Sequence, residues 1–137
     1  MRDSAKSDII SLSQRRIDTL AGGEKTLVML ARVLAGKPAV ILADEPVSGL
    51  DPNHQLQVME LLTSLARQGC TVLVVLHDLS LAARFCQKLF LIKAGQLIAS
   101  GSPEVVLTPE NLRLGYSIEA RLTPSSEGLG VIPWKRV

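Results

Sequence analysis

The chain has 137 residues, of which 47% are hydrophobic and 20% charged, a composition typical of one globular domain, or part of one, and not of a disordered protein. Its 15 basic and 13 acidic residues are dispersed along the chain, so no basic surface predicts nucleic acid as a partner. No stretch reaches the roughly 18 apolar residues of a membrane span, and residues 1–16 lack the apolar segment of a signal peptide, so we expect neither a membrane-spanning segment nor export.

The first predicted elements alternate between helix and strand. Apolar residues at helical spacing predict a helix over residues 24–35, directly after two glycines. Residues 39–43 (AVILA) are uniformly apolar and flanked by breakers, which predicts a strand covered on both faces. A second helix is predicted after this strand, ending near Gly69, and residues 71–76 (TVLVVL) predict another buried strand.

The next elements are shorter. Residues 79–86 predict a helix, and residues 89–92 and 97–99 predict a hairpin around an Ala-Gly turn. Ser102, followed by Pro and Glu, has the composition of a helix start, which predicts one more short helix.

The last part of the chain gives a weaker pattern. Residues 118–137 contain one short candidate strand, around residues 120–122, and a Ser- and Gly-rich loop, and we interpret them as a C-terminal tail behind a domain over residues 1–117. The alternation of strand and helix before the tail predicts the α/β class with a mostly parallel sheet.

Two acids follow the first predicted strand. Ligands of parallel α/β sheets bind beyond the carboxyl ends of the strands, which is the predicted position of Asp44 and Glu45. A magnesium ion on a nucleotide phosphate would satisfy both carboxylates, with Asp44 in the shell of the ion and Glu45 orienting or deprotonating a water. The alternative is a strand that ends in two solvated acids before a turn.

Two further features favour the phosphate interpretation. His77 follows the second predicted strand as Asp44 follows the first, so neighbouring strands would open the imidazole and both carboxylates onto one crevice. Gly22 and Gly23 precede a helix, where backbone N–H groups and the helix dipole favour an anion, although two glycines at a helix start are also an ordinary tight turn.

Three segments in this order, LAGGEKTLVMLARVLAG, AVILADEPVSGLD and TVLVVLHD, resemble the second half of the nucleotide-binding domain of ABC transporter ATPases, a P-loop NTPase-type fold. The resemblance covers most of residues 15–105. It implies that Asp44 is the magnesium-shell aspartate of the Walker B strand, Glu45 the catalytic glutamate and His77 the histidine that senses the γ-phosphate. It also assigns nucleotide contacts to two segments, which we call the signature loop (Leu20, Ala21, Gly22, Gly23 and Glu24) and the D-loop (Ser48, Gly49, Leu50 and Asp51).

The chain departs from this family at two points. Ala21 stands where the family usually has serine, which removes a hydroxyl expected near the γ-phosphate of the partner subunit's nucleotide, although the amides of Gly22 and Gly23 remain. These residues also contain no G-x-x-x-x-G-K-[ST] motif, so the P-loop and its strand are missing from them. We therefore expect the C-terminal portion of a longer ATPase, inactive by itself and, because the gap exposes strand edges, marginally stable or associating.

The resemblance implies the ligands and partners of the whole protein. It implies ATP and Mg²⁺, a head-to-tail dimer with a second ABC ATPase subunit, transmembrane permease subunits and a peripheral place at the cytoplasmic face of the membrane. The amino-acid sequence from His77 to Arg113 is similar to the corresponding sequences of importers of iron siderophores, haem and cobalamin. Two alternatives stay open: a catalytically dead module that pairs with a complete ATPase, and a soluble ABC-type ATPase of repair or translation.

Three other features have simpler interpretations. We expect His54 to be a surface residue, because no second ligand lies near it in the sequence. Arg15 and Arg16 are expected on a solvated face, with a contact to a transmembrane partner as the alternative, and Trp134 is expected to anchor the tail by packing.

Overall fold

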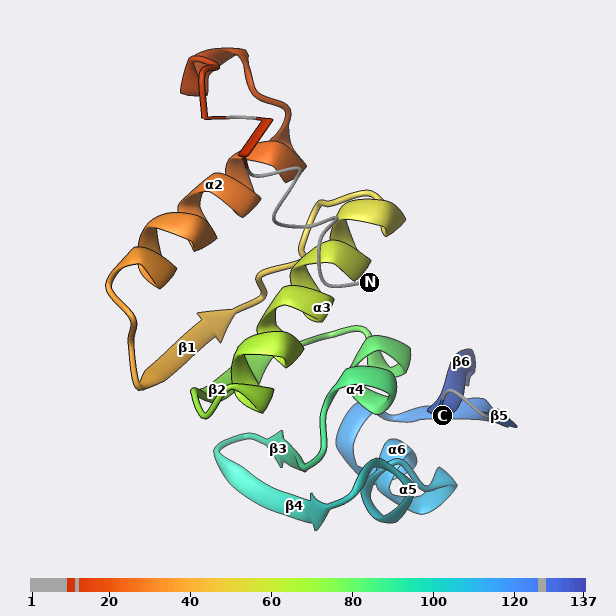
Figure 1. Ribbon diagram of the computed structural model, residues 1–137. Coiled ribbons are helices and arrows are strands. Elements are labelled where there is room, and N and C mark those ends of the chain that lie inside the picture. The colour runs from red at the N-terminus through yellow and green to blue at the C-terminus, as the bar shows by residue number, and fades with distance from the viewer. Residues whose placement is uncertain (1–9, 12, 126–127) are drawn as a thin grey trace. The chain divides into compact units, whose positions relative to one another are not determined.

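A computed structural model of the chain describes residues 10–11, 13–125 and 128–137 (Figure 1). The chain divides into two compact units, one ending at Val75 and the other beginning at Leu76, and each is described by itself. Within the described ranges, no helix combines the length and the apolar character needed to cross a bilayer.

The first unit alternates between helix and strand. Its described elements are η1 (Ile17–Thr19), α2 (Gly22–Ala35), β1 (Val40–Asp44), α3 (Pro52–Arg67) and β2 (Thr71–Val75). The two predicted helices and the two predicted strands are therefore confirmed, and α2 begins two residues earlier than expected, at the first glycine of the signature loop.

Strands β1 and β2 form the parallel pair that the sequence predicts. They pair in register from Val40 opposite Thr71 to Asp44 opposite Val75. Helix α3, which connects them, packs on β2. The parallel part of the expected sheet is this pair, since the other strand pairs of the described residues are antiparallel.

The prediction that both faces of these strands are covered was wrong. Side chains alternate between the two faces of a strand, and Ile41 is buried while Leu42 is 75% exposed. Leu73 and Val75 of β2 are also half exposed. A continuous apolar run predicts that a strand is hydrophobic on both faces, but it does not supply the second covering layer.

Helix α3 has a defined start and a buried stripe. Asp51 is its N-cap, and the Asp51 carboxylate accepts hydrogen bonds from the backbone N–H groups of Asn53 and His54, at 3.0 and 3.2 Å. The buried apolar side chains of the first unit come from both helices, from β1 and from the segments before α2 and after β1: Leu20, Leu27, Ile41, Val47, Val58, Met59 and Leu62.

The second unit combines short helices with antiparallel hairpins (Figure 1). Its described elements are α4 (Leu79–Phe85), β3 (Leu89–Lys93), β4 (Gln96–Gly101), α5 (Pro103–Val106), α6 (Pro109–Tyr116), β5 (Ile118–Ser125) and β6 (Gly128–Arg136). The predicted hairpin is confirmed as β3–β4, with Ala94 and Gly95 at φ values of 49° and 77° in its turn. Two positive φ values in a two-residue connection are typical of a type I′ turn.

The residues predicted as a tail form a second hairpin. Strands β5 and β6 pair from Ile118 opposite Arg136 to Ser125 opposite Gly128, so the expectation of one short strand was wrong. Val131 of β6 is buried with Leu79 and Leu112, and the Ser80 hydroxyl bonds to both the N–H and the carbonyl of Val131 at 3.0 Å. Cross-strand pairing and this core contact outweigh the glycines and the proline of β6, which lower its strand propensity.

The expected packing role of Trp134 was also wrong. Its side chain is 59% exposed, and the guanidinium carbon of Arg121 lies 3.4 Å from the centre of its ring. The indole is thus one half of a surface cation–π pair across β5–β6 and not part of the core.

Candidate functional site

The acids that follow the first strand lie at the carboxyl end of the parallel pair, as predicted. Asp44 is the last residue of β1 and pairs with Val75, the last residue of β2. The N–H group of Glu45 donates a hydrogen bond to the carbonyl of Val75 at 3.1 Å, which continues the ladder by one residue. Both acidic residues are exposed, so their carboxylates can reach a ligand beyond the strand ends.

Glu45 has an unusual backbone conformation. Its φ is 45°, in the left-handed region that residues with a Cβ rarely adopt. A turn fixes it there, because the Glu45 carbonyl accepts a hydrogen bond from Ser48 at 3.1 Å and Val47 is buried beneath the turn. Strained backbone of this kind is concentrated at functional sites, where it aims a side chain that an ordinary strand would direct elsewhere.

The D-loop leads directly into α3. Ser48 and Gly49 are exposed, and Gly49 has a φ of 70°, which glycine adopts without strain. Asp51 then caps the helix through its carboxylate, so the end of the D-loop is held by two residues of the first turn of α3, Asn53 and His54.

His54 is the partner of Asp51 that the sequence analysis missed. The Nδ1–H group of its imidazole donates a hydrogen bond to Asp51, because a carboxylate can only accept. This bond lowers the pKa of the Asp51 carboxyl below its ordinary value. The His54 side chain is 24% exposed, so it reaches the surface but is partly buried. The Asp-x-x-His spacing is a signal for the contact, since the N-cap and third residues of a helix are adjacent.

The two glycines of the signature loop differ in their surroundings. Gly22 is exposed, and a Cβ on it would meet nothing within 4 Å. Gly23 is buried, and a Cβ on it would lie 2.3 Å from the Cγ atom of His54. Gly22 is therefore the exposed glycine of the signature loop, whereas position 23 favours glycine because an imidazole lies close to it.

Glu24 and Leu20 fix the ends of the signature loop. The Glu24 carboxylate accepts a hydrogen bond from the N–H of Ala21 at 2.8 Å and pairs with Arg15 at 2.7 Å. The Ala21 contact, with Arg15 and His54 as further causes, lowers the pKa of the Glu24 carboxyl. Leu20 is 5% exposed, so its side chain anchors the loop in the core. Arg15 is therefore an ion-pair partner at the signature loop, while Arg16 pairs with Asp18 at 2.8 Å.

His77 belongs to the second unit, two residues before α4, and Asp44 and Glu45 belong to the first. The convergence of these three side chains on one pocket stays a prediction. Within the first unit the structure brings together the signature loop and the end of the D-loop, through His54.

The two acids at the end of β1 fit a hydrated magnesium ion. Asp44 and Glu45 provide exposed carboxylate oxygens, the hard donors that this ion prefers. Among the described residues, no cluster of three or more His, Cys, Asp or Glu side chains could enclose a metal. Magnesium bound with a nucleotide usually keeps several waters and takes one or two carboxylates, so a full protein cage is not required.

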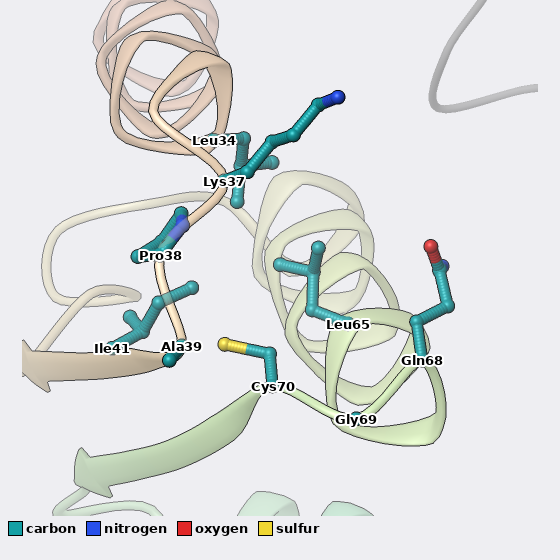
Figure 2. A pocket seen from close by; sticks show the side chains of 9 residues that line it. All are labelled: Leu34, Lys37, Pro38, Ala39, Ile41, Leu65, Gln68, Gly69 and Cys70. Atoms are coloured by element: carbon teal, nitrogen blue, oxygen red, sulfur yellow. The ribbon is translucent and has the colours of Figure 1, made fainter.

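A cavity of the first unit lies at the amino ends of β1 and β2, opposite the ends that carry Asp44 and Glu45. It has a volume of about 360 Å³ and is lined by residues at the amino ends of β1 and β2 and by the ends of the two helices. In Figure 2 the Cys70 thiol, Leu65 and Ile41 surround it, while the Lys37 amine extends away. This cavity is therefore distinct from the position of Asp44 and Glu45.

Comparison with known proteins agrees with these motifs. Residues 3–48 match the family described as ABC transporter. The chain is 42% identical over 135 residues to the hemin import ATP-binding protein HmuV of Bordetella avium, covering 93% of this chain and 52% of that protein. It is 47% identical over 120 residues to the HmuV protein of Pseudomonas aeruginosa, covering 84% of this chain and 47% of that protein. The chain thus spans about half the length of these curated relatives.

Solved structures give the same similarity at the level of the fold. An inward-facing ABC transporter of proposed metal-chelate type matches with a TM-score of 0.80 and 27% identity, over 96% of this chain and 56% of that chain. A dimeric ATP-binding cassette with bound ADP and phosphate matches with a TM-score of 0.60 and 32% identity, over 74% of this chain and 47% of that chain.

Proposed function

Because this chain belongs to the family of ABC transporter ATP-binding domains, we propose that it forms the signature-loop and Walker B portion of an ATP-hydrolysing importer subunit. The observation that carries the proposal is Glu45, an acid in left-handed backbone at the carboxyl end of a parallel strand pair. Its position supports a base or water-positioning group at a phosphate site.

The proposed reaction is in-line attack of water on the γ-phosphate of ATP. The bond from the water oxygen to phosphorus forms while the bond from phosphorus to the ADP oxygen breaks, and Glu45 receives or directs the proton of the water. Asp44 would hold the shell of a magnesium ion, which would supply charge neutralisation on the phosphates. His77 donates to the γ-phosphate as charge redistributes in the transition state.

The proposed assembly is a head-to-tail dimer of ABC ATPase subunits. In this arrangement the signature loop contacts the nucleotide held by the P-loop of the partner subunit, and Asp51 of the D-loop couples the two sites. The ADP-bound dimer among the similar structures supports it. The subunit would sit peripherally on the cytoplasmic face of the membrane, against permease subunits.

The proposed transport substrate is haem or a related iron chelate. Support comes from the named hemin import relatives and from the similar transporter of proposed metal-chelate type. The substrate crosses through the permease and does not touch this subunit, so the support is by relationship and not by a pocket in these residues.

Glu45→Gln tests the proposal in the complete subunit that carries these residues. The variant keeps the size of the side chain but cannot accept a proton, so kcat for ATP hydrolysis should fall by about 100-fold or more. Binding of a fluorescent ATP analogue should persist, because the base does not hold the nucleotide. Glu110→Gln, which alters an exposed acid at the start of α6, is the matched control. Unchanged turnover in Glu45→Gln would remove Glu45 from this role.

Ala21 favours a second candidate, a binding module that pairs with a complete ATPase and does not hydrolyse ATP itself. Steady-state ATP hydrolysis by the complete subunit that carries these residues separates the two. A module gives no turnover from the Glu45 site, whereas the main proposal predicts turnover that Glu45→Gln abolishes. The 137-residue chain by itself is expected to hydrolyse no ATP.

A further inference from the structure

His54 fills the space beside the signature loop. A Cβ added to Gly23 would lie 2.3 Å from Cγ, 2.5 Å from Cδ2 and 2.8 Å from Nδ1 of His54. These are atoms at the base of the ring, which cannot move without moving the whole side chain, so a Cβ at position 23 would have to displace the imidazole. The glycine and the imidazole are therefore complementary in shape.

The same imidazole also forms a hydrogen bond to the D-loop. Nδ1 of His54 donates to the Asp51 carboxylate, and the same carboxylate accepts the backbone N–H groups of α3. The ring is thus hydrogen-bonded to Asp51 and packed against Gly23. The side chain is 24% exposed, so its rotamer is set by these contacts and not by solvent.

Charged groups around the ring reinforce its placement. Asp51 is hydrogen-bonded to the ring, and His54 is also among the causes that lower the pKa of the Glu24 carboxyl in the first turn of α2. Arg15 pairs with Glu24 on the side of the signature loop. The imidazole therefore interacts with an acid of each of the two segments that the proposed function assigns to nucleotide contacts, by a hydrogen bond to Asp51 and at longer range with Glu24.

We propose that His54 is a positioning residue that couples the signature loop to the D-loop, so that Gly22 and Gly23 move together with Asp51. This inference rests on the proposed function for its consequence, because the coupled segments serve two nucleotide sites of the dimer. The imidazole transmits displacement of one segment to the other through van der Waals contact with Gly23 and the hydrogen bond to Asp51.

A double-mutant cycle between Gly23 and His54 tests the contact in the complete subunit. Gly23→Ala should lower kcat about tenfold with His54 present and less than about twofold in a His54→Ala background, because removal of the ring makes room for the methyl group. Thermal unfolding should give the same pattern, with Gly23→Ala lowering Tm by about 3 °C or more only when the ring is present. Gly22→Ala, which meets no neighbour, is the matched control for Tm.

Equal losses from Gly23→Ala in both backgrounds would overturn the packing argument. Because the unfolding cycle does not depend on catalysis, it stays decisive even if the subunit hydrolyses no ATP. A protein that lacks activity but shows the coupled Tm values would contradict the proposed function and leave the contact in place.

Two substitutions of His54 separate the hydrogen bond from the volume of the ring. His54→Asn keeps a donor near the position of Nδ1, and His54→Phe keeps a ring without the donor. If the link to Asp51 matters for turnover, His54→Phe should lower kcat about tenfold with KM for ATP within about twofold, and His54→Asn should restore most of the loss. Equal kcat values in the two variants, or a change in KM alone, would contradict the proposed coupling.

Discussion

At the scale of single residues, Ala21 is the N-cap of α2 but has no side-chain acceptor for the free N–H groups of the helix. Glu24 compensates in part, because its carboxylate accepts the Ala21 N–H at 2.8 Å. The chain therefore has half of a capping box, in which a serine or threonine at the N-cap would supply the other half.

Ala21→Ser should complete the capping box and stabilise the protein by about 1 kcal/mol. The added hydroxyl accepts the N–H of Glu24, and in the proposed ATPase dimer it adds a donor for the γ-phosphate, so KM for ATP should fall. Denaturant unfolding and steady-state kinetics measure the two effects. A lower KM without added stability would assign the hydroxyl to the nucleotide alone, and the reverse result would assign it to the helix.

At the scale of secondary structure, the β3–β4 hairpin depends on a turn whose first residue is strained. Ala94 has a φ of 49°, a conformation that asparagine adopts more readily than alanine in the first position of a type I′ turn. Ala94→Asn should stabilise the protein by up to about 1 kcal/mol, measured as a shift of the unfolding midpoint. Ala94→Val should shift it in the opposite direction, because a β-branched side chain is disfavoured at positive φ.

The elements that the sequence predicted well are those in which one pattern decides the structure. Helical spacing in α2 and α3 and the apolar runs of β1 and β2 agree with their final pairing. Strand β6 was missed because glycine and proline weaken its pattern, while its register comes from β5 and its burial from α4. Such partners are distant or weakly patterned in sequence, so local propensity cannot reveal them.

The candidate site also contains residues that the sequence could place and residues that it could not. Asp44 and Glu45 were placed correctly because the end of an apolar strand is visible in the sequence. The packing of His54 against Gly23 was not visible in the sequence, since it joins two helices that are separated along the chain. The left-handed φ of Glu45 was equally hidden, because it follows from the turn closed by Ser48 and not from residue type.

At the scale of the whole molecule, several carboxyl groups have pKa values below their ordinary values: Asp18, Glu24, Asp51, Glu104 and Glu119. In Glu119 the main cause is a hydrogen bond from Lys135, followed by one from Arg113. These contacts connect β5 to β6 and to α6, with ion-pair distances of 3.2 and 3.0 Å.

A lowered pKa in the folded state means that folding favours the ionised form. The stability that Glu119 contributes is therefore present above its ordinary pKa of 4.5 and is lost as the pH falls through the lower folded value. We expect Tm to decrease as the pH falls below about 4.5, and to decrease less steeply in Glu119→Gln. Differential scanning calorimetry between pH 3 and 7 measures the slope, with Glu60→Gln as the control. Parallel slopes for Glu119→Gln and the unmodified chain would contradict this assignment.

The uneven covering of the β1–β2 pair has a practical consequence for preparing this protein. Leu42 and Leu73 present hydrocarbon to water in the middle of the pair, at 75% and 54% of their area. A preparation in which this surface is bare should adsorb to phenyl resins and enhance the fluorescence of anilinonaphthalene dyes. Replacing Leu42 with threonine should suppress both effects while keeping the strand, whereas the same change at the buried Ile41 should unfold the first unit.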